Sequence, residues 1–175
     1  FRSGVTALGL AYVVGVQPTL SVWRPGKAPL PPGRRGKRGV PSSRVGRSPD
    51  HAPTSAKALA QGLEPDAWQT VVWREGTNAD LSSRFAAVRL RPASRDYKLT
   101  EPRAEEWLLI EWPEGDPEPL KYWLSTLADD IPLEDLVNNA KLRWRIERDY
   151  QELKQEPGLG HYEGRGWRGF HNAQG

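Results

Sequence analysis

The chain has 175 residues, of which 37% are hydrophobic and 27% are charged, with a net charge of +3, a mean hydropathy of -0.68 and no cysteine. This length is enough for one ordinary domain with a buried core, and the lack of cysteine excludes a disulfide framework and a cysteine-ligated zinc site. No apolar run is long enough to cross a membrane, and mild positive charge alone is compatible with a nucleic-acid partner without demonstrating one.

Residues 1–17 are predicted to end a helix and then form one strand. Val5 and Leu8 have helical spacing, and Gly9 ends the helix. Residues 10–16 are a short, nearly continuous apolar run, as in strands of a sheet that is buried on both faces. Because position 1 is Phe and no methionine occurs, we expect the chain to be an internal part of a longer protein.

Residues 18–53 differ sharply in composition from the rest of the chain. Pro, Gly, Ser and Arg dominate, and eight basic residues stand against Asp50 as the single acid. Such a stretch buries too little apolar surface to order itself, so we expect it to be disordered when free. Two interpretations stay equally open, namely a basic loop that grips phosphates and a solvated linker.

Residues 54–128 are predicted to form a short helix and then an antiparallel sheet. Thr54 or Ser55 caps the helix, which is rich in Ala and Leu and ends near residue 63. Four strand-like runs follow, separated by Gly, Asn and Pro: residues 69–74, 83–91, 105–112 and 120–127.

Residues 129–175 are predicted to begin with one long helix. Asp129 or Asp130 caps it, Pro132 lies in its first turn, and Pro157 followed by Gly ends it. A basic, Gly-rich loop follows the helix.

A row of polar residues occupies the side of this helix that should meet a core. Arg143, Glu147, Tyr150 and Lys154 lie within roughly 60° of each other around the helix axis. A charged row on a buried side is costly unless its members are paired or serve a site. Spacing alone favours an ordinary ion pair between Arg143 and Glu147.

This helix resembles the signature helix of the DDE transposases of bacterial insertion sequences, which carries Tyr, Arg, Glu and Lys at fixed spacing. Arg143, Glu147 and Lys154 match that spacing, whereas the Tyr position holds Ala140. Five more segments look like the same family: residues 9–16, 81–88, 106–113, 121–126 and 160–170. The resemblance implies an α+β fold, a partial RNase H-like (ribonuclease H-like) catalytic core with a mostly-β insertion and a long C-terminal helix carrying the catalytic Glu.

The resemblance also implies a division of the chain into four parts. Residues 1–17 would be the end of the RNase H-like core sheet, and residues 18–53 a basic, Pro/Gly-rich disordered loop. Residues 54–128 would be a short helix plus the β insertion. Residues 129–175 would be the catalytic-Glu helix and a truncated C-terminal core segment, because the family continues after residue 170 into a helix that this sequence does not show.

The implied activity of the parent protein is divalent-metal-dependent DNA cleavage and strand transfer of insertion-sequence ends. Three carboxylates hold Mg²⁺ or Mn²⁺ in this chemistry, and Glu147 is the implied catalytic residue and metal ligand. The other two are Asp residues implied to lie upstream of Phe1. We therefore expect the chain alone to be inactive and to bind no metal, and whether it is itself an enzyme stays open. The alternative to a transposase fragment is a non-catalytic nucleic-acid-binding remnant.

Acids within the chain are poor substitutes for those Asp residues. Asp129 with Asp130, and Glu105 with Glu106, are adjacent pairs. Adjacent residues point apart on a strand, and a helix cap or a strand edge explains these positions more simply.

The implied partners are the terminal inverted repeats of the insertion sequence and target DNA, without a membrane. Cutting two ends at once favours a homodimer of the intact parent, and the implied location is the bacterial cytoplasm at the nucleoid. Arg143 and Lys154 would contact DNA phosphates beside the metal site, while Tyr150 would stack there or pack in the core.

Basic and aromatic residues alternate in residues 160–170, where Arg165 and Arg168 flank Trp167. This pattern suits phosphate contacts with stacking, although a turn that docks Trp167 onto the core is the preferred interpretation. In relatives with a β insertion, an aromatic residue can also hold a flipped base. Five tryptophans lie in or near the predicted strands, for which core packing is the alternative: Trp68, Trp73, Trp107, Trp112 and Trp123.

Overall fold

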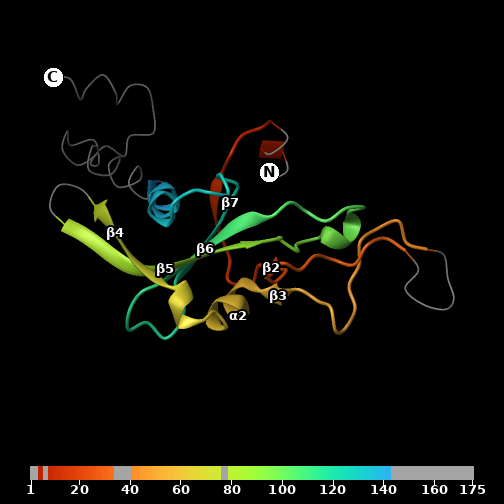
Figure 1. Ribbon diagram of the computed structural model, residues 1–175, viewed down its shortest axis with the longest axis horizontal. Helices are drawn as coiled ribbons and strands as arrows, with labels where there is room; N and C mark the ends of the chain where they lie inside the picture. The colour runs from red at the N-terminus through yellow and green to blue at the C-terminus, as the bar shows by residue number, and fades with distance from the viewer. Residues whose placement is uncertain (1–3, 6–7, 34–40, 76–78, 143–175) are drawn as a thin grey trace, which may run out of the picture. The chain divides into compact units, whose positions relative to one another are not determined.

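The structure is a computed structural model that describes residues 4–5, 8–33, 41–75 and 79–142 (Figure 1). The chain divides into two units, Phe1–Ala140 and Lys141–Gly175. The fold described below is that of the first unit.

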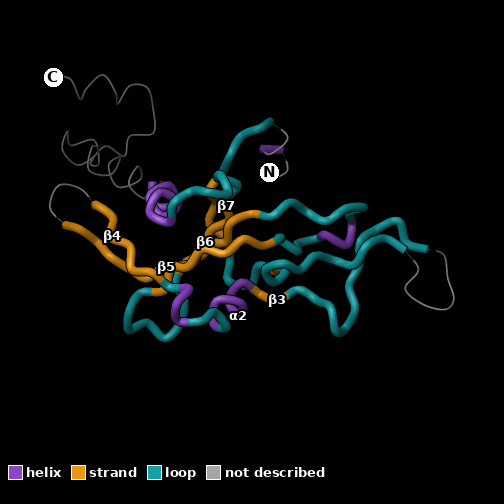
Figure 2. Tube along the Cα trace, in the orientation of Figure 1, coloured by secondary structure: helices purple, strands orange, loops and turns teal. Residues whose placement is uncertain are grey.

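Five antiparallel strands form one sheet in the order β1-β7-β6-β5-β4 (Figure 2). The strands are β1 (Val13–Val16), β4 (Gln69–Glu75), β5 (Ala79–Leu90), β6 (Glu106–Trp112) and β7 (Lys121–Ser125). The expectation of an antiparallel sheet from the four runs between residues 69 and 127 is confirmed, and β1 adds a fifth strand. With helices outside the sheet, the fold is α+β.

β6 is the central strand, and its sequence shows why. Leu108, Leu109 and Ile110 follow one another and are all fully buried. Successive side chains of a strand point to opposite faces, so a continuous apolar run requires a core on each side of the sheet. Leu108 and Ile110 belong to one core and Leu109 to the other.

The first core lies between the sheet and α2 (Ala56–Gln61). Its helix residues Ala56, Leu59 and Ala60 are spaced as one helical face. The Ser55 hydroxyl accepts a hydrogen bond from the Ala58 backbone N–H at 3.1 Å, which confirms Ser55 as the cap. The strand residues of this core, with one from a loop, are Tyr12, Val22, Leu90, Leu108, Ile110, Tyr122 and Leu124.

The second core lies between the other face of the sheet and a helix that begins at residue 133. Leu136, Val137 and Ala140 of this helix pack with Val71, Trp73, Phe85 and Leu109. No helix among the described residues is both long enough and apolar enough to cross a membrane.

The start of this second helix differs from the sequence prediction. Its first backbone hydrogen bond runs from Leu136 N–H to the Pro132 carbonyl at 3.0 Å, so Pro132 precedes the helix. Neither Asp129 nor Asp130 is the cap, because the helix begins only at residue 133. The Asp129 carboxylate instead lies 2.7 Å from Arg89 Nη2. The helix is described as far as residue 142, and the remainder of the predicted helix lies outside the described residues.

β1 confirms the predicted strand but differs in its surroundings. Val13 packs against the second core and Val14 and Val16 against the first, which explains the apolar run. However, β1 is an edge strand that pairs with β7 alone, so its valines are only partly buried and Gly15 is exposed.

Residues 18–33 and 41–53 have defined positions in the structure, although we expected the free segment of residues 18–53 to be disordered. β2 (Ser21–Val22) pairs with β3 (Thr54–Ser55), and isolated bridges join Leu30 to Gly46 and Gly33 to Ser42. Val22, Trp23 and Val45 are at most 2% exposed. Composition judges a segment on its own, whereas these three residues are buried against other parts of the chain.

Candidate functional site

The residues predicted from the signature helix and the loop after it lie outside the described part of the chain. They are Arg143, Glu147, Tyr150, Lys154, Arg165 and Arg168. Their roles therefore stay predictions.

The described acids do not fit a metal centre with three carboxylates. Within the described ranges, no group of three or more His, Cys, Asp or Glu could hold a metal ion. Glu105 lies 3.3 Å from Arg91 Nη2, whereas the neighbouring Glu106 accepts a hydrogen bond from the Tyr12 hydroxyl at 2.7 Å. The adjacent carboxylates Glu105 and Glu106 thus have different partners.

Three of the five candidate tryptophans pack against the second core. Trp73 is 7% exposed and meets Phe85 edge to face, with ring centroids 5.5 Å apart. Trp107 and Trp123 are partly buried against the same core. The Trp107 indole N–H donates to the Ala128 carbonyl at 3.0 Å. These contacts favour the core-packing interpretation for all three.

Trp68 and Trp112 form a separate, partly exposed pair. Their ring centroids are 5.4 Å apart in an edge-to-face arrangement, and the Arg84 guanidinium lies 5.8 Å from the Trp112 ring centroid. Arg84 pairs with Thr70 on β4 and with Trp112 on β6, so the three residues share one face of the sheet. Trp68 also packs against the first core, so this pair is only partly accessible to a ligand.

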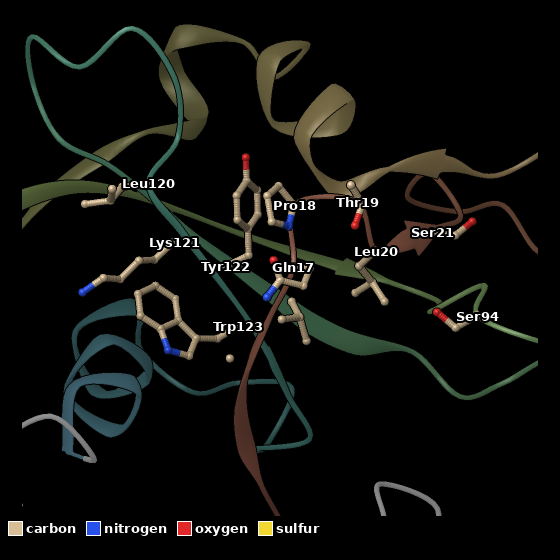
Figure 3. Close-up of a pocket in the computed structure, with 12 residues that line it drawn as sticks. Gln17, Pro18, Thr19, Leu20, Ser21, Ser94, Leu120, Lys121, Tyr122 and Trp123 are labelled. Carbon is tan, nitrogen blue, oxygen red and sulfur yellow. The ribbon is translucent and has the colours of Figure 1, made fainter. Parts of the chain in front are cut away.

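An open pocket of about 750 Å³ lies where β1 leads into residues 17–21, beside the start of β7 (Figure 3). Figure 3 shows the side chains of Tyr122 and Trp123 on opposite sides of β7. Lys121 is the single charged residue among those that line the pocket, and no lining residue is an acid or a histidine. The pocket therefore contains no acid–base pair and suits binding better than catalysis.

Tyr122 is the lining residue with an altered acidity. Its hydroxyl is buried and has no hydrogen-bond partner among the described residues. Burial raises the pKa of Tyr122, and the negative charge of Glu118 raises it further. Tyr122 is thus held as the neutral phenol.

A buried carboxylate connects the basic segment to the loop after β5. Asp96 is 1% exposed, and its Oδ2 accepts a hydrogen bond from the Trp23 indole N–H at 2.7 Å. Its Oδ1 accepts one from Arg47 Nη2 at 2.5 Å, and Arg47 also donates to the Ala93 carbonyl at 2.6 Å. Burying a carboxylate is costly unless it is paired and hydrogen-bonded, and here both oxygens have donors. We call these contacts of Asp96, Trp23 and Arg47 the Asp96 network.

Sequence analysis missed the Asp96 network. Asp96 lies 73 residues from Trp23 and 49 residues from Arg47. One signal was available in the sequence. Residues 18–53 have eight basic residues and one acid, so most of these basic residues need an acid from another part of the chain to form an ion pair.

A small pocket of about 190 Å³ lies beside this network. It is lined by Trp23, Arg24, Lys27, Asp50, His51 and Ala52. The His51 and Trp23 ring centroids are 5.0 Å apart, and His51 Nε2 lies 2.6 Å from the Ala28 carbonyl oxygen. Because a carbonyl only accepts, Nε2 carries the proton. The pocket thus combines two exposed cations with an imidazole of defined orientation.

Residues 1–80 match the family model described as DDE superfamily endonuclease. The matched part is just under half of the chain and ends at the start of β5. Neither the curated proteins nor the solved structures include a match to this chain. The family match supports a nuclease or transposase function of the DDE type, which acts on DNA.

Proposed function

We propose that this chain is part of a DDE transposase of a bacterial insertion sequence, which cuts and transfers the ends of the element. The observation that carries the proposal is the match of residues 1–80 to the DDE superfamily endonuclease model. The spacing of Arg143, Glu147 and Lys154 supports it from a part of the chain that the match does not include. Two separate stretches thus resemble related enzymes.

In this proposal Glu147 is a catalytic residue that supplies one carboxylate ligand to Mg²⁺ or Mn²⁺. Carboxylate oxygens suit both ions. Arg143 and Lys154 bind DNA phosphates near the cleaved bond, the first as a planar fork and the second as a flexible point charge. Tyr150, Arg165 and Arg168 are further DNA contacts of the same proposal.

The proposed fold is an RNase H-like core that a mostly-β insertion interrupts. The antiparallel pairing of β4 to β7 supports the assignment of residues 54–128 to such an insertion. The pairing of β1 with β7 gives this insertion a direct backbone connection to residues 1–17.

A non-catalytic role in DNA binding is the second candidate for this chain. The observation that favours it is that hydrogen bonds from Trp23 and Arg47 to Asp96 hold the basic segment in a defined arrangement. DNA binding through the basic residues of this segment needs no catalytic acid. In that case the partners remain the terminal repeats and target DNA, and the metal is not required.

Nicking of a supercoiled plasmid that carries insertion-sequence ends tests both candidates. The chain is incubated with Mg²⁺ or Mn²⁺ and compared with Glu147→Ala and with Glu134→Ala, whose side chain is exposed on the helix that begins at residue 133. Nicking that only Glu147→Ala abolishes would show that acids of this chain complete a metal site with Glu147, against the expected inactivity of the chain alone, and equal nicking by all three refutes a role of Glu147. Salt-sensitive DNA binding without nicking agrees with that inactivity and leaves the second candidate standing, and the absence of both activities refutes DNA as the partner of this chain.

A further inference from the structure

Positive charge is concentrated in two segments that are far apart in sequence. The described residues 23–33, 41–51 and 91–100 contain seven Arg and Lys but two Asp, whereas the whole chain has 25 basic and 22 acidic residues. The net charge of these residues exceeds the +3 of the whole chain, so the rest of the chain is net negative. Such separation of charge is the electrostatic pattern of a surface that binds a polyanion.

Backbone hydrogen bonds join the two segments along their length (Figure 2). Trp23 N–H donates to the Arg91 carbonyl at 2.9 Å, and Val45 N–H donates to the Leu99 carbonyl at 2.9 Å. The Asp96 network adds side-chain bonds between the same segments. The basic residues of both segments are therefore presented by one bonded unit.

Some of these cations stabilise the unit and others are exposed. Arg47 bonds to Asp96, and Arg91 lies 3.3 Å from Glu105 Oε1. In contrast, Arg24, Lys27, Arg95 and Lys98 are exposed and form no ion pair with another described residue. We call these four residues the basic surface.

The Asp96 network brings the two halves of the basic surface together. Arg24 directly follows Trp23, and Arg95 directly precedes Asp96, so each cation is one residue from a partner in the 2.7 Å bond between the Trp23 indole and Asp96. Arg24 and Lys27 also line the pocket of about 190 Å³, together with Trp23, Asp50, His51 and Ala52.

Arg95 has an unusual backbone conformation that supports a binding role. Its φ of 56° makes it the single residue other than glycine with positive φ among the described residues. An arginine is strained there, and such strain persists where the surrounding bonds enforce it and where function uses it. The Asp96 N–H bond to the Ala93 carbonyl and the Lys98 N–H bond to the Arg95 carbonyl hold this turn, which leaves the Arg95 side chain exposed.

We propose that the basic surface binds the phosphate backbone of duplex DNA. This inference rests on the proposed function, in which DNA is the partner, and it assigns a contact surface separate from the signature helix. Cations spread over two joined segments suit a repeating polyanion. An anionic membrane is the less favoured partner, because Tyr97 is the only exposed large hydrophobic residue that the structure describes in these segments, and membrane binding needs an apolar face.

Fluorescence anisotropy with a labelled, mixed-sequence duplex of about 25 base pairs tests the proposal, with salt varied from about 50 to about 200 mM. The complete chain is compared with Arg24→Gln/Lys27→Gln and with Arg95→Asn/Lys98→Gln, since Asn tolerates positive φ. The control is Lys57→Gln, which removes one positive charge from α2, where Lys57 forms an ion pair with Glu118. Circular dichroism confirms that each variant is folded.

Each lost phosphate contact should lower the slope of log affinity against log salt by about 0.9. Each double variant on the basic surface is therefore expected to lose about 1.8 from that slope and at least about tenfold in affinity near 0.1 M salt, while the control changes little.

Four results would overturn the inference. Wild-type affinity in both basic-surface variants would place the DNA contacts elsewhere and leave the proposed function intact, and equal weakening in the control would show an effect of net charge alone. No binding by the wild-type chain would reject both the inference and DNA as the partner. Charge-dependent binding to vesicles that contain phosphatidylserine, with no effect of these variants on DNA binding, would identify a membrane partner instead.

Discussion

Replacing Asp96 by alanine should destabilise the fold, because it removes the acceptor for two donors at once. The Trp23 indole N–H would lose its acceptor at 2.7 Å in a site where Trp23 is 2% exposed. Arg47 would lose its 2.5 Å bond to Oδ1 but would keep its bond to the Ala93 carbonyl.

The magnitude follows from the exposure of the two donors. A buried donor without a partner costs about 1–3 kcal/mol. The Arg47 side chain is 34% exposed, so water replaces part of its lost interaction, and we assign about 1 kcal/mol to it. The free energy of unfolding should thus fall by about 2–4 kcal/mol, which corresponds to a Tm roughly 5–15 °C lower for a chain of this size.

Thermal unfolding followed by circular dichroism measures this change. Asp50→Ala is the matched control, because Asp50 is an exposed acid of the basic segment. The loss of stability for Asp96→Asn should lie between the losses for Asp96→Ala and Asp50→Ala, since the amide oxygen of Asn can still accept one of the two hydrogen bonds. A loss for Asp96→Ala no larger than that for Asp50→Ala would refute the argument that the Asp96 network holds the two segments together.

Two further predictions concern the sheet. Leu109→Ala, at a fully buried position of the central strand, should lower the free energy of unfolding by about 2–5 kcal/mol. Val72→Ala, at a position that is 59% exposed, should change it by less than about 0.5 kcal/mol. Similar midpoints of urea unfolding for the two variants would contradict the described core. Tyr122→Phe should be neutral or stabilising by up to about 1 kcal/mol, because it removes a buried hydroxyl without a partner. Since the pKa of Tyr122 is raised above 10.0 in the folded state, the wild-type chain should lose stability as pH rises above that value, and Tyr122→Phe should lose less. Glu118→Gln should lower the Tyr122 pKa only slightly in an absorbance titration, because burial is the larger cause; a return to the usual value would show that the charge of Glu118 dominates.

The sheet and α2 were largely predictable because their signals are local. Four strand-like runs marked β4 to β7, and the Gly, Asn and Pro residues between them marked the turns. Ser55 was one of two candidate caps, and its hydrogen bond to Ala58 N–H requires only residues three apart. The start of the helix at residue 133 was harder to predict, because Asp129 forms an ion pair with Arg89 of β5, which is distant in the sequence.

The candidate sites show a similar division. The spacing of Arg143, Glu147 and Lys154 could be recognised in the sequence, although these residues lie outside the described part of the chain. The basic surface could not be recognised, because it combines two segments that are far apart in the sequence and that only the tertiary structure joins.

The sequence by itself determined the strand-like runs and the signature spacing, and it limited the cap of α2 to Thr54 or Ser55, since each of these depends on residues that are close in the chain. Only the tertiary structure decided that β1 is an edge strand beside β7 and that residues 18–33 and 41–53 are ordered. The physical reason is that burial of Val22, Trp23 and Val45 depends on surfaces distant in sequence. The same long-range contacts provide Asp96 with its two donors, and composition contains no information about such pairings.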